Sequence, residues 1–187
     1  ETFRFGHMQL FYSRRIGITG GNFIPILAGA RLQGKVGNGT TLGVMSIQTE
    51  KTTLDGQSSA IPQTNFSVIR IKQDVFSRST IGAIFLNKQE IDGSYNRSFG
   101  IDTDFKLSQN LSFFAVGAGT FSPDEEDGPS GKRNNFSGTA GFNWQSDRWQ
   151  YSASFLDIEK DFNPEMGFIR RTGFKRTTGR ITFSPRP

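Results

Sequence analysis

The chain has 187 residues, a formal net charge of +5 and a hydrophobic fraction of 34%, which suits one domain and leaves little material for membrane helices. With no cysteine, it has no disulfide bonds, thiolate metal sites or cysteine nucleophiles, and its one histidine, His7, leaves little scope for histidine-based catalysis. The 22 glycines argue against a helical bundle, because glycine destabilises helix interiors. The polar, aromatic start at Glu1 does not resemble a signal peptide, so we expect a mature, trimmed or partial chain.

Ten segments along the chain predict β-strands. The clearest are 95–107 and 135–145, in which apolar and polar residues alternate with a period of two, as in a strand with one apolar and one polar face. Their length of about ten residues matches the ~9–11 that cross a bilayer as a tilted strand, whereas strands of soluble proteins cluster near ~5–6. In chain order the predicted strands are 3–12, which is the weakest, then 26–36, 41–50, 65–75, 80–89, 95–107, 111–121, 135–145, 148–158 and 173–184.

The predicted connections alternate between short and long. Outer-membrane barrels have this arrangement, with tight turns on one rim and long loops on the other. If 3–12 is a strand, both chain ends lie on the short-turn side and the number of strands is even, as in bacterial single-chain barrels. Short turns rich in Gly, Asn, Asp and Ser are expected at 37–40, 76–79, 108–110 and 146–147, and long polar loops at 13–25, 51–64, 122–134 and 159–172, with a shorter one near 90–94.

Charged residues gather on one predicted face of the strands and apolar residues on the other. The apolar face, with Phe99, Ile101 and Phe155, is expected to contact lipid, because a Lys or Arg facing the bilayer midplane costs ~2–4 kcal/mol. The charged face is therefore expected to line a hydrated lumen. The candidate lumen-facing residues are Arg31, Lys35, Arg70, Lys72, Asp74, Asp102, Asp104 and Lys106.

Three predicted strands, 41–50, 80–89 and 111–121, have apolar residues on both faces. In 80–89, for example, Phe85 competes with Leu86 for the apolar face. We expect such strands to contact lipid outside and a packed plug or a partner inside.

Several spaced motifs resemble a known family. They are 10–17 (LFYSRRIG), 25–32 (PILAGARL), 64–68 (TNFSV), 78–85 (RSTIGAIF) and 161–171 (DFNPEMGFIRR). Together they are similar to a family of uncharacterised bacterial proteins in which a carbohydrate-binding-module-like domain of the family-9 type precedes a C-terminal outer-membrane β-barrel domain. The resemblance implies an envelope-located protein, a barrel larger than the part seen here, and a link to glycan binding or uptake through the module, which is missing from this chain. It implies no catalytic residues.

Acidic residues offer two chemical alternatives to a lumen lining. Asp102 and Asp104 lie two positions apart on one face, a spacing that suits the paired carboxylates of a glycosidase. Carboxylates neutralised by Arg or Lys on neighbouring strands are the simpler interpretation. The run 124–128 (DEEDG) offers oxygen ligands for Ca²⁺ but lacks the spacing of a dedicated calcium loop, so a solvated acidic loop is preferred. We therefore predict no metal site and no cofactor.

Basic residues in two predicted loops form a candidate anion site. Arg14, Arg15, Arg170 and Arg171 fall in the loops that flank the ends of the segment. They are expected to bind lipopolysaccharide phosphates or a polyanionic solute, or else to pair with acidic loop residues. Nucleic acid is not expected as a partner, because the basic residues are spread over many strands.

The sequence as a whole predicts an all-β protein: an antiparallel up-and-down transmembrane β-barrel, or barrel segment, of the bacterial outer membrane. The domain covers 1–187, with a first strand and long loop in 1–25 and regular hairpins in 26–187. We expect a conduit, receptor or envelope scaffold that contacts outer-membrane lipid or lipopolysaccharide, and also glycans or other envelope proteins, and that is not an enzyme. Two alternatives stay open: a soluble sugar-binding or lipocalin-like barrel with its apolar face inward, and an outer-membrane hydrolase that uses lumen carboxylates.

Overall fold

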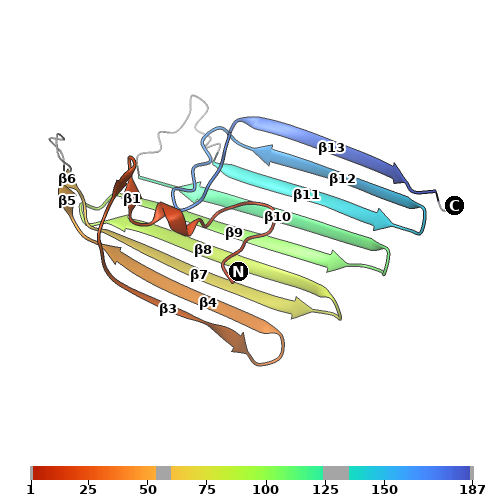
Figure 1. The fold of residues 1–187 in the computed structure, drawn as a ribbon, viewed down its shortest axis with the longest axis horizontal. Coiled ribbons are helices and arrows are strands. Elements are labelled where there is room, and N and C mark those ends of the chain that lie inside the picture. The colour runs from red at the N-terminus through yellow and green to blue at the C-terminus, as the bar shows by residue number, and fades with distance from the viewer. Residues whose placement is uncertain (1, 54–59, 124–134, 186–187) are drawn as a thin grey trace.

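The computed structural model describes residues 2–53, 60–123 and 135–185, and in these residues the chain is all-β. Within them the main sheet has nine antiparallel strands in the order β13-β12-β11-β10-β9-β8-β7-β4-β3, so that each strand pairs with the next main-sheet strand along the chain (Figure 1). The strands of the main sheet are β3 (Ile26–Val36), β4 (Thr40–Thr49), β7 (Thr64–Val75), β8 (Ser79–Glu90), β9 (Tyr95–Lys106), β10 (Leu111–Phe121), β11 (Phe136–Gln145), β12 (Trp149–Ile158) and β13 (Phe174–Phe183).

Short elements accompany the main sheet in the predicted long loops. A 3-10 helix, η1 (Ser13–Arg15), is followed by β1 (Ile18–Thr19), which pairs with β2 (Asn22–Phe23). Further along, β5 (Thr52–Thr53) pairs with β6 (Ala60–Ile61). The described part of the chain has no helix that is long and apolar enough to cross a membrane.

The connections of the main sheet alternate in length, as the sequence predicted. Tight turns join β3 to β4, β7 to β8, β9 to β10 and β11 to β12 at one end of the sheet, which we call the short-turn end (Figure 1). The longer connections lie at the opposite, long-loop end. In the first turn, Gly37 and Gly39 have φ angles of 58° and 85°, left-handed values that glycine adopts without steric cost.

The prediction of a strand at 3–12 is wrong. These residues belong to an irregular segment, residues 2–16, that lies across one face of the main sheet and that we call the N-terminal segment (Figure 1). Its aromatic start resembles a strand in sequence, but the chain turns at Gly6 with φ of 38°, and Phe5 and Leu10 on either side of the turn are both buried. Without this strand, the described main sheet has an odd number of strands, so the expected even number is also wrong for these residues.

The two faces of the main sheet differ in what lies over them. The covered face packs against the N-terminal segment and the loop of residues 159–172, whereas in the described residues nothing packs over the opposite, apolar face. On β9, Ile101 on the apolar face is 59% exposed, and the next residue, Asp102 on the covered face, is 9% exposed. The exposed side chains of the apolar face include Leu32, Ile69, Ile71, Ile81, Phe85, Phe99, Ile101, Phe113, Phe136, Phe142, Trp149, Phe155, Ile181 and Phe183.

The hydrophobic core lies between the covered face and the N-terminal segment. This core explains why the strands predicted at 41–50, 80–89 and 111–121 have apolar residues on both faces. These strands are β4, β8 and β10, and they place Met45, Leu86 and Val116, respectively, under the N-terminal segment. The N-terminal segment thus packs on one face of these three strands, and the predicted lipid contact of their other face stays a prediction. The core consists of Phe3, Phe5, Met8, Leu10, Ile16, Met45, Phe66, Val68, Ile84, Leu86, Val116, Ala118, Ile158, Phe162 and Met166.

The 159–172 loop holds the N-terminal segment by backbone hydrogen bonds. The Tyr12 N–H donates to the Met166 carbonyl at 2.8 Å, and the Phe168 N–H donates to the Gln9 carbonyl at 2.8 Å. These bonds satisfy backbone groups that an irregular segment cannot pair within itself. The two segments therefore form one layer over the sheet.

Gly167→Ala is expected to loosen this layer. A Cβ at position 167 would lie 2.5 Å from the Gln9 carbonyl oxygen and 2.8 Å from that of Leu10, so backbone must move, at a cost of about 1–3 kcal/mol. The urea midpoint of unfolding should fall, and trypsin should cleave the N-terminal segment faster. Gly179→Ala is the matched control, because nothing lies within 4 Å of its Cβ position. Equal effects of the two substitutions would contradict the close contact.

Candidate functional site

A buried ion pair lies on the covered face. Arg70 Nη1 donates to Asp102 Oδ1 at 2.6 Å and Arg70 Nη2 to Asp102 Oδ2 at 2.8 Å. Arg70 comes from β7 and Asp102 from β9, and the two side chains meet above Gly82 of the intervening strand β8. A Cβ at Gly82 would lie 2.6 Å from both Arg70 Nη1 and Asp102 Oδ1, so a larger residue there would separate the pair.

The surroundings of the ion pair favour a structural role over hydrolysis. The Phe5 ring centroid lies 5.3 Å from Arg70 Cζ, within the range of a cation–π contact. Both carboxylate oxygens of Asp102 accept hydrogen bonds from Arg70, whereas Asp104 is exposed and lies 3.5 Å from Lys106 Nζ. Arg70 Nε is buried without a hydrogen-bond partner in the described residues. The two aspartates thus occupy different environments, each beside a cation, but the cation lies two strands away for Asp102 and on the same strand for Asp104, and not on neighbouring strands as the sequence predicted.

All the predicted lumen-facing residues share the covered face, as the strand registers show. The structure brings Arg70, Lys72, Asp102 and Asp104 together around one polar hollow of about 430 Å³, which Arg4 also lines. Arg4 was not among the predicted residues, because it lies in the segment that the sequence analysis treated as a strand.

The remaining predicted residues lie outside this hollow. Arg31 and Lys35 are exposed on β3, an edge of the main sheet, and Arg31 Cζ lies 5.1 Å from the ring centroid of Phe3. Asp74 is exposed near the short-turn end of β7, and Lys106 ends β9.

The predicted loop arginines belong to two separate places in the described chain. Arg14 and Arg15 are exposed on η1. Arg170 and Arg171 line a hollow of about 340 Å³ beside β12 and β13, where Arg171 Cζ lies 5.5 Å from the ring centroid of Phe174. The structure therefore does not group them as one four-arginine site.

Asn96 is a buried residue whose importance the sequence analysis missed. Its Nδ2 donates to Ser122 Oγ at 2.9 Å and to the Asn163 carbonyl at 3.0 Å, and its Oδ1 accepts from the Glu165 N–H at 3.1 Å. One side chain on β9 thus fixes the 159–172 loop. An Asn in an alternating strand carries no sequence signal for such a role.

A second polar cluster holds the same loop at the long-loop end. Lys88 Nζ lies 2.7 Å from Glu165 Oε2 and 2.7 Å from Glu90 Oε1. These side chains are partly exposed, so water screens the pairs, and they position the loop more than they stabilise the fold.

His7 packs on Phe114 of β10, with ring centroids 3.9 Å apart, a contact that indicates a structural role. Within the described ranges, no group of three or more His, Cys, Asp or Glu side chains is placed to hold a metal ion. The acidic run at 124–128 lies outside the described residues.

Comparisons with known proteins give no identification: no protein-family model, curated protein or solved structure matches the chain. The described residues define an all-β protein whose antiparallel main sheet has one exposed apolar face and one covered, charged face. Its function is therefore argued from the chemistry of these two faces.

Asp102→Asn is expected to destabilise the fold by about 3–5 kcal/mol, because it leaves the buried Arg70 charged without an anion. The double substitution Arg70→Met with Asp102→Leu should recover most of this loss, since it removes both charges. Urea unfolding measures both effects. The exposed Asp104→Asn serves as control and should change stability little. A double variant as unstable as Asp102→Asn would show that the charge balance of the pair is not what matters.

Proposed function

We propose that the chain forms an arc of a transmembrane β-barrel in the bacterial outer membrane, with its apolar face against lipid and its covered face toward the interior. The observation that carries this proposal is the contrast between the faces: Ile101 and Phe155 are exposed on one, and Arg70 and Asp102 are buried on the other. Soluble monomers rarely expose large continuous apolar patches. Strands of 10–12 residues in the main sheet also fit a tilted crossing of a bilayer.

The aromatic side chains of the apolar face that are in contact with one another form two groups, one toward each end of the strands. Toward the long-loop end, Phe99, Phe121 and Phe136 pack together with ring centroids 5.5–6.5 Å apart. Two aromatic girdles around an apolar band mark the interfaces of a membrane barrel. The group toward the short-turn end comprises Phe76, Phe105, Trp144, Trp149, Tyr151 and Phe183.

Polar side chains replace apolar ones on this face near the long-loop end. Asn65 Nδ2 donates to Gln48 Oε1 at 3.2 Å, linking β7 to β4. Arg97 Nε donates to Asn87 Oδ1 at 3.1 Å, linking β9 to β8. Such a row of hydrogen-bonded polar groups suits the lipid headgroup layer. It therefore marks where the apolar band ends on the side of the long-loop end.

The edges of the main sheet indicate how the barrel would close. In an antiparallel sheet with an odd number of strands, the two edge strands, here β3 and β13, run in the same direction. Antiparallel closure therefore needs an odd number of further strands between them, which would give the even total of bacterial single-chain barrels. Unpaired edges are not tolerated in lipid, which supports a barrel larger than the described strands.

The position of the N-terminal segment helps to distinguish among the functions that such a barrel could have. A conduit, a receptor and an envelope scaffold share this architecture, but the N-terminal segment and the 159–172 loop pack on the covered face, where a solute would pass. This packing favours a receptor or scaffold with a partly filled interior. The resemblance to barrel domains that follow a sugar-binding module adds glycans to the candidate ligands.

Thr177→Arg is expected to impair membrane insertion, whereas Thr178→Arg is not. The two threonines are adjacent and exposed on β13, but Thr177 pairs with Phe155 on the apolar face and Thr178 with Ser154 on the covered face. An arginine facing acyl chains costs up to ~2–4 kcal/mol, and less near the interfaces. The free energy of unfolding from lipid vesicles and the fraction of chain in the membrane pellet measure the difference.

Fractionation of cells tests the location directly. We expect the chain in the outer-membrane fraction, released by detergent and not by high salt. Recovery of folded chain in the aqueous fraction, with the two arginine variants equally stable, would contradict the proposal. That outcome would favour the soluble sugar-binding or lipocalin-like alternative.

A further inference from the structure

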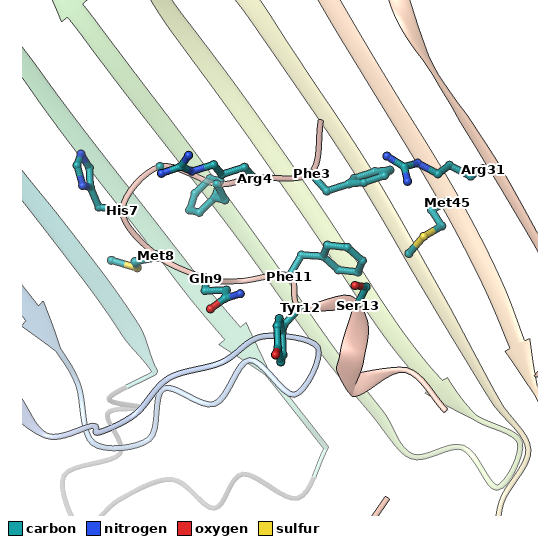
Figure 2. A pocket seen from close by; sticks show the side chains of 12 residues that line it. Phe3, Arg4, His7, Met8, Gln9, Phe11, Tyr12, Ser13, Arg31 and Met45 are labelled. Atoms are coloured by element: carbon teal, nitrogen blue, oxygen red, sulfur yellow. The ribbon is translucent and has the colours of Figure 1, made fainter. Parts of the chain in front are cut away.

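Two hollows on the covered face lie along the N-terminal segment and share residues 7–9 as part of their walls. The larger has a volume of about 670 Å³ and lies between the N-terminal segment and the edge of the sheet, where Arg31 and Met45 line it (Figure 2). The smaller, of about 340 Å³, lies on the side of β12 and β13. The larger hollow adjoins the ion pair through Phe5, whose ring lies against Arg70, and neither hollow belongs to the proposed membrane contact.

The described residues that line these hollows include arginines and no carboxylate. Arg4 and Arg31 line the larger hollow, and all the arginines of both hollows are exposed. On the covered face, Asp102 is paired with Arg70, Glu165 with Lys88, and Asp104 lies beside Lys106. The hollows therefore carry a positive potential that neighbouring acids do not cancel, which attracts anions. The arginines of the smaller hollow are Arg170, Arg171 and Arg176.

Aromatic rings line the larger hollow beside the arginines. Arg31 lies against Phe3, with Cζ 5.1 Å from the ring centroid, and the Phe3 and Phe11 centroids are 5.5 Å apart (Figure 2). Arg31 Nη2 also donates to Gln33 Oε1. These contacts hold the guanidinium before any ligand arrives, which lowers the entropy cost of binding.

We propose that the larger hollow binds an organic anion with more than one acidic group. One acidic group (a carboxylate, sulfate or phosphate) pairs with Arg31 and a second with Arg4, since the planar fork of arginine matches such oxyanions. An apolar ring of the ligand lies against Phe11 and Tyr12, which line the same hollow. Its volume is within the ~300–1,000 Å³ of small-molecule sites. Anion binding at this hollow is expected whether lipid or water contacts the apolar face.

The test is a fluorescence-anisotropy titration of the folded full chain in detergent with pyranine, a polysulfonated pyrene. We expect saturable binding that tripolyphosphate displaces and that neutral maltotriose does not. Arg31→Gln and Arg4→Gln should each weaken binding about tenfold, because each removes one charge-assisted pair. Circular dichroism and tryptophan fluorescence establish that each variant is folded.

Arg78→Gln is the matched control. It removes the same charge from the exposed turn between β7 and β8, away from both hollows, and should leave the affinity unchanged. Absence of saturable binding, full affinity in the folded Arg4→Gln and Arg31→Gln variants, or an equal loss in Arg78→Gln would overturn the site. Displacement of pyranine by maltotriose would also overturn it, since the ligand would then be recognised without its charge.

Discussion

The alternation of side chains along each strand is the constraint on which the rest of the structure depends. Successive residues face opposite sides of a sheet, so one register assigns every residue to one of two environments. A slip of one residue in β9 would move Asp102 to the apolar face and place Ile101 under the N-terminal segment. The exposed apolar face, the buried ion pair and the cationic hollows therefore all depend on the same strand register.

The covered face is built so that charge and irregular backbone are both tolerated. Arg70 and Asp102 are buried because Gly82 leaves room for them to meet across β8, and Phe5 covers them from the N-terminal segment. That segment pairs with no strand in the part of the chain that the structure describes, and its hydrogen bonds to the 159–172 loop take the place of such pairing. Asn96 in turn fixes the loop. Sheet, segment and loop are thus coupled through a few polar contacts.

The strands and their faces were predictable because they depend on local period-two patterns. The irregular conformation of residues 3–12 was not predictable, since Phe3 and Phe5 alternate with polar residues as in a strand. The turn at Gly6 instead places Phe5 and Leu10 in the core of the folded chain. The sequence placed Arg70 and Asp102 on one face without indicating that they pair, because their meeting depends on a glycine in the strand between them. The role of the 159–172 loop was also hidden, as its contacts to Asn96 span 69 residues.

The central claim is that the two faces meet different solvents, and the lack of native cysteine makes it directly measurable. Single cysteines placed along β13 from 176 to 182 in membrane-reconstituted chain can carry nitroxide labels, whose collisions with oxygen and with a water-soluble nickel complex are read by electron paramagnetic resonance. Oxygen concentrates in acyl chains, so the account predicts the highest oxygen accessibility at 177, 179 and 181 and the highest nickel accessibility at 176, 178, 180 and 182. Uniform accessibility along the strand, or the opposite phase, would contradict it.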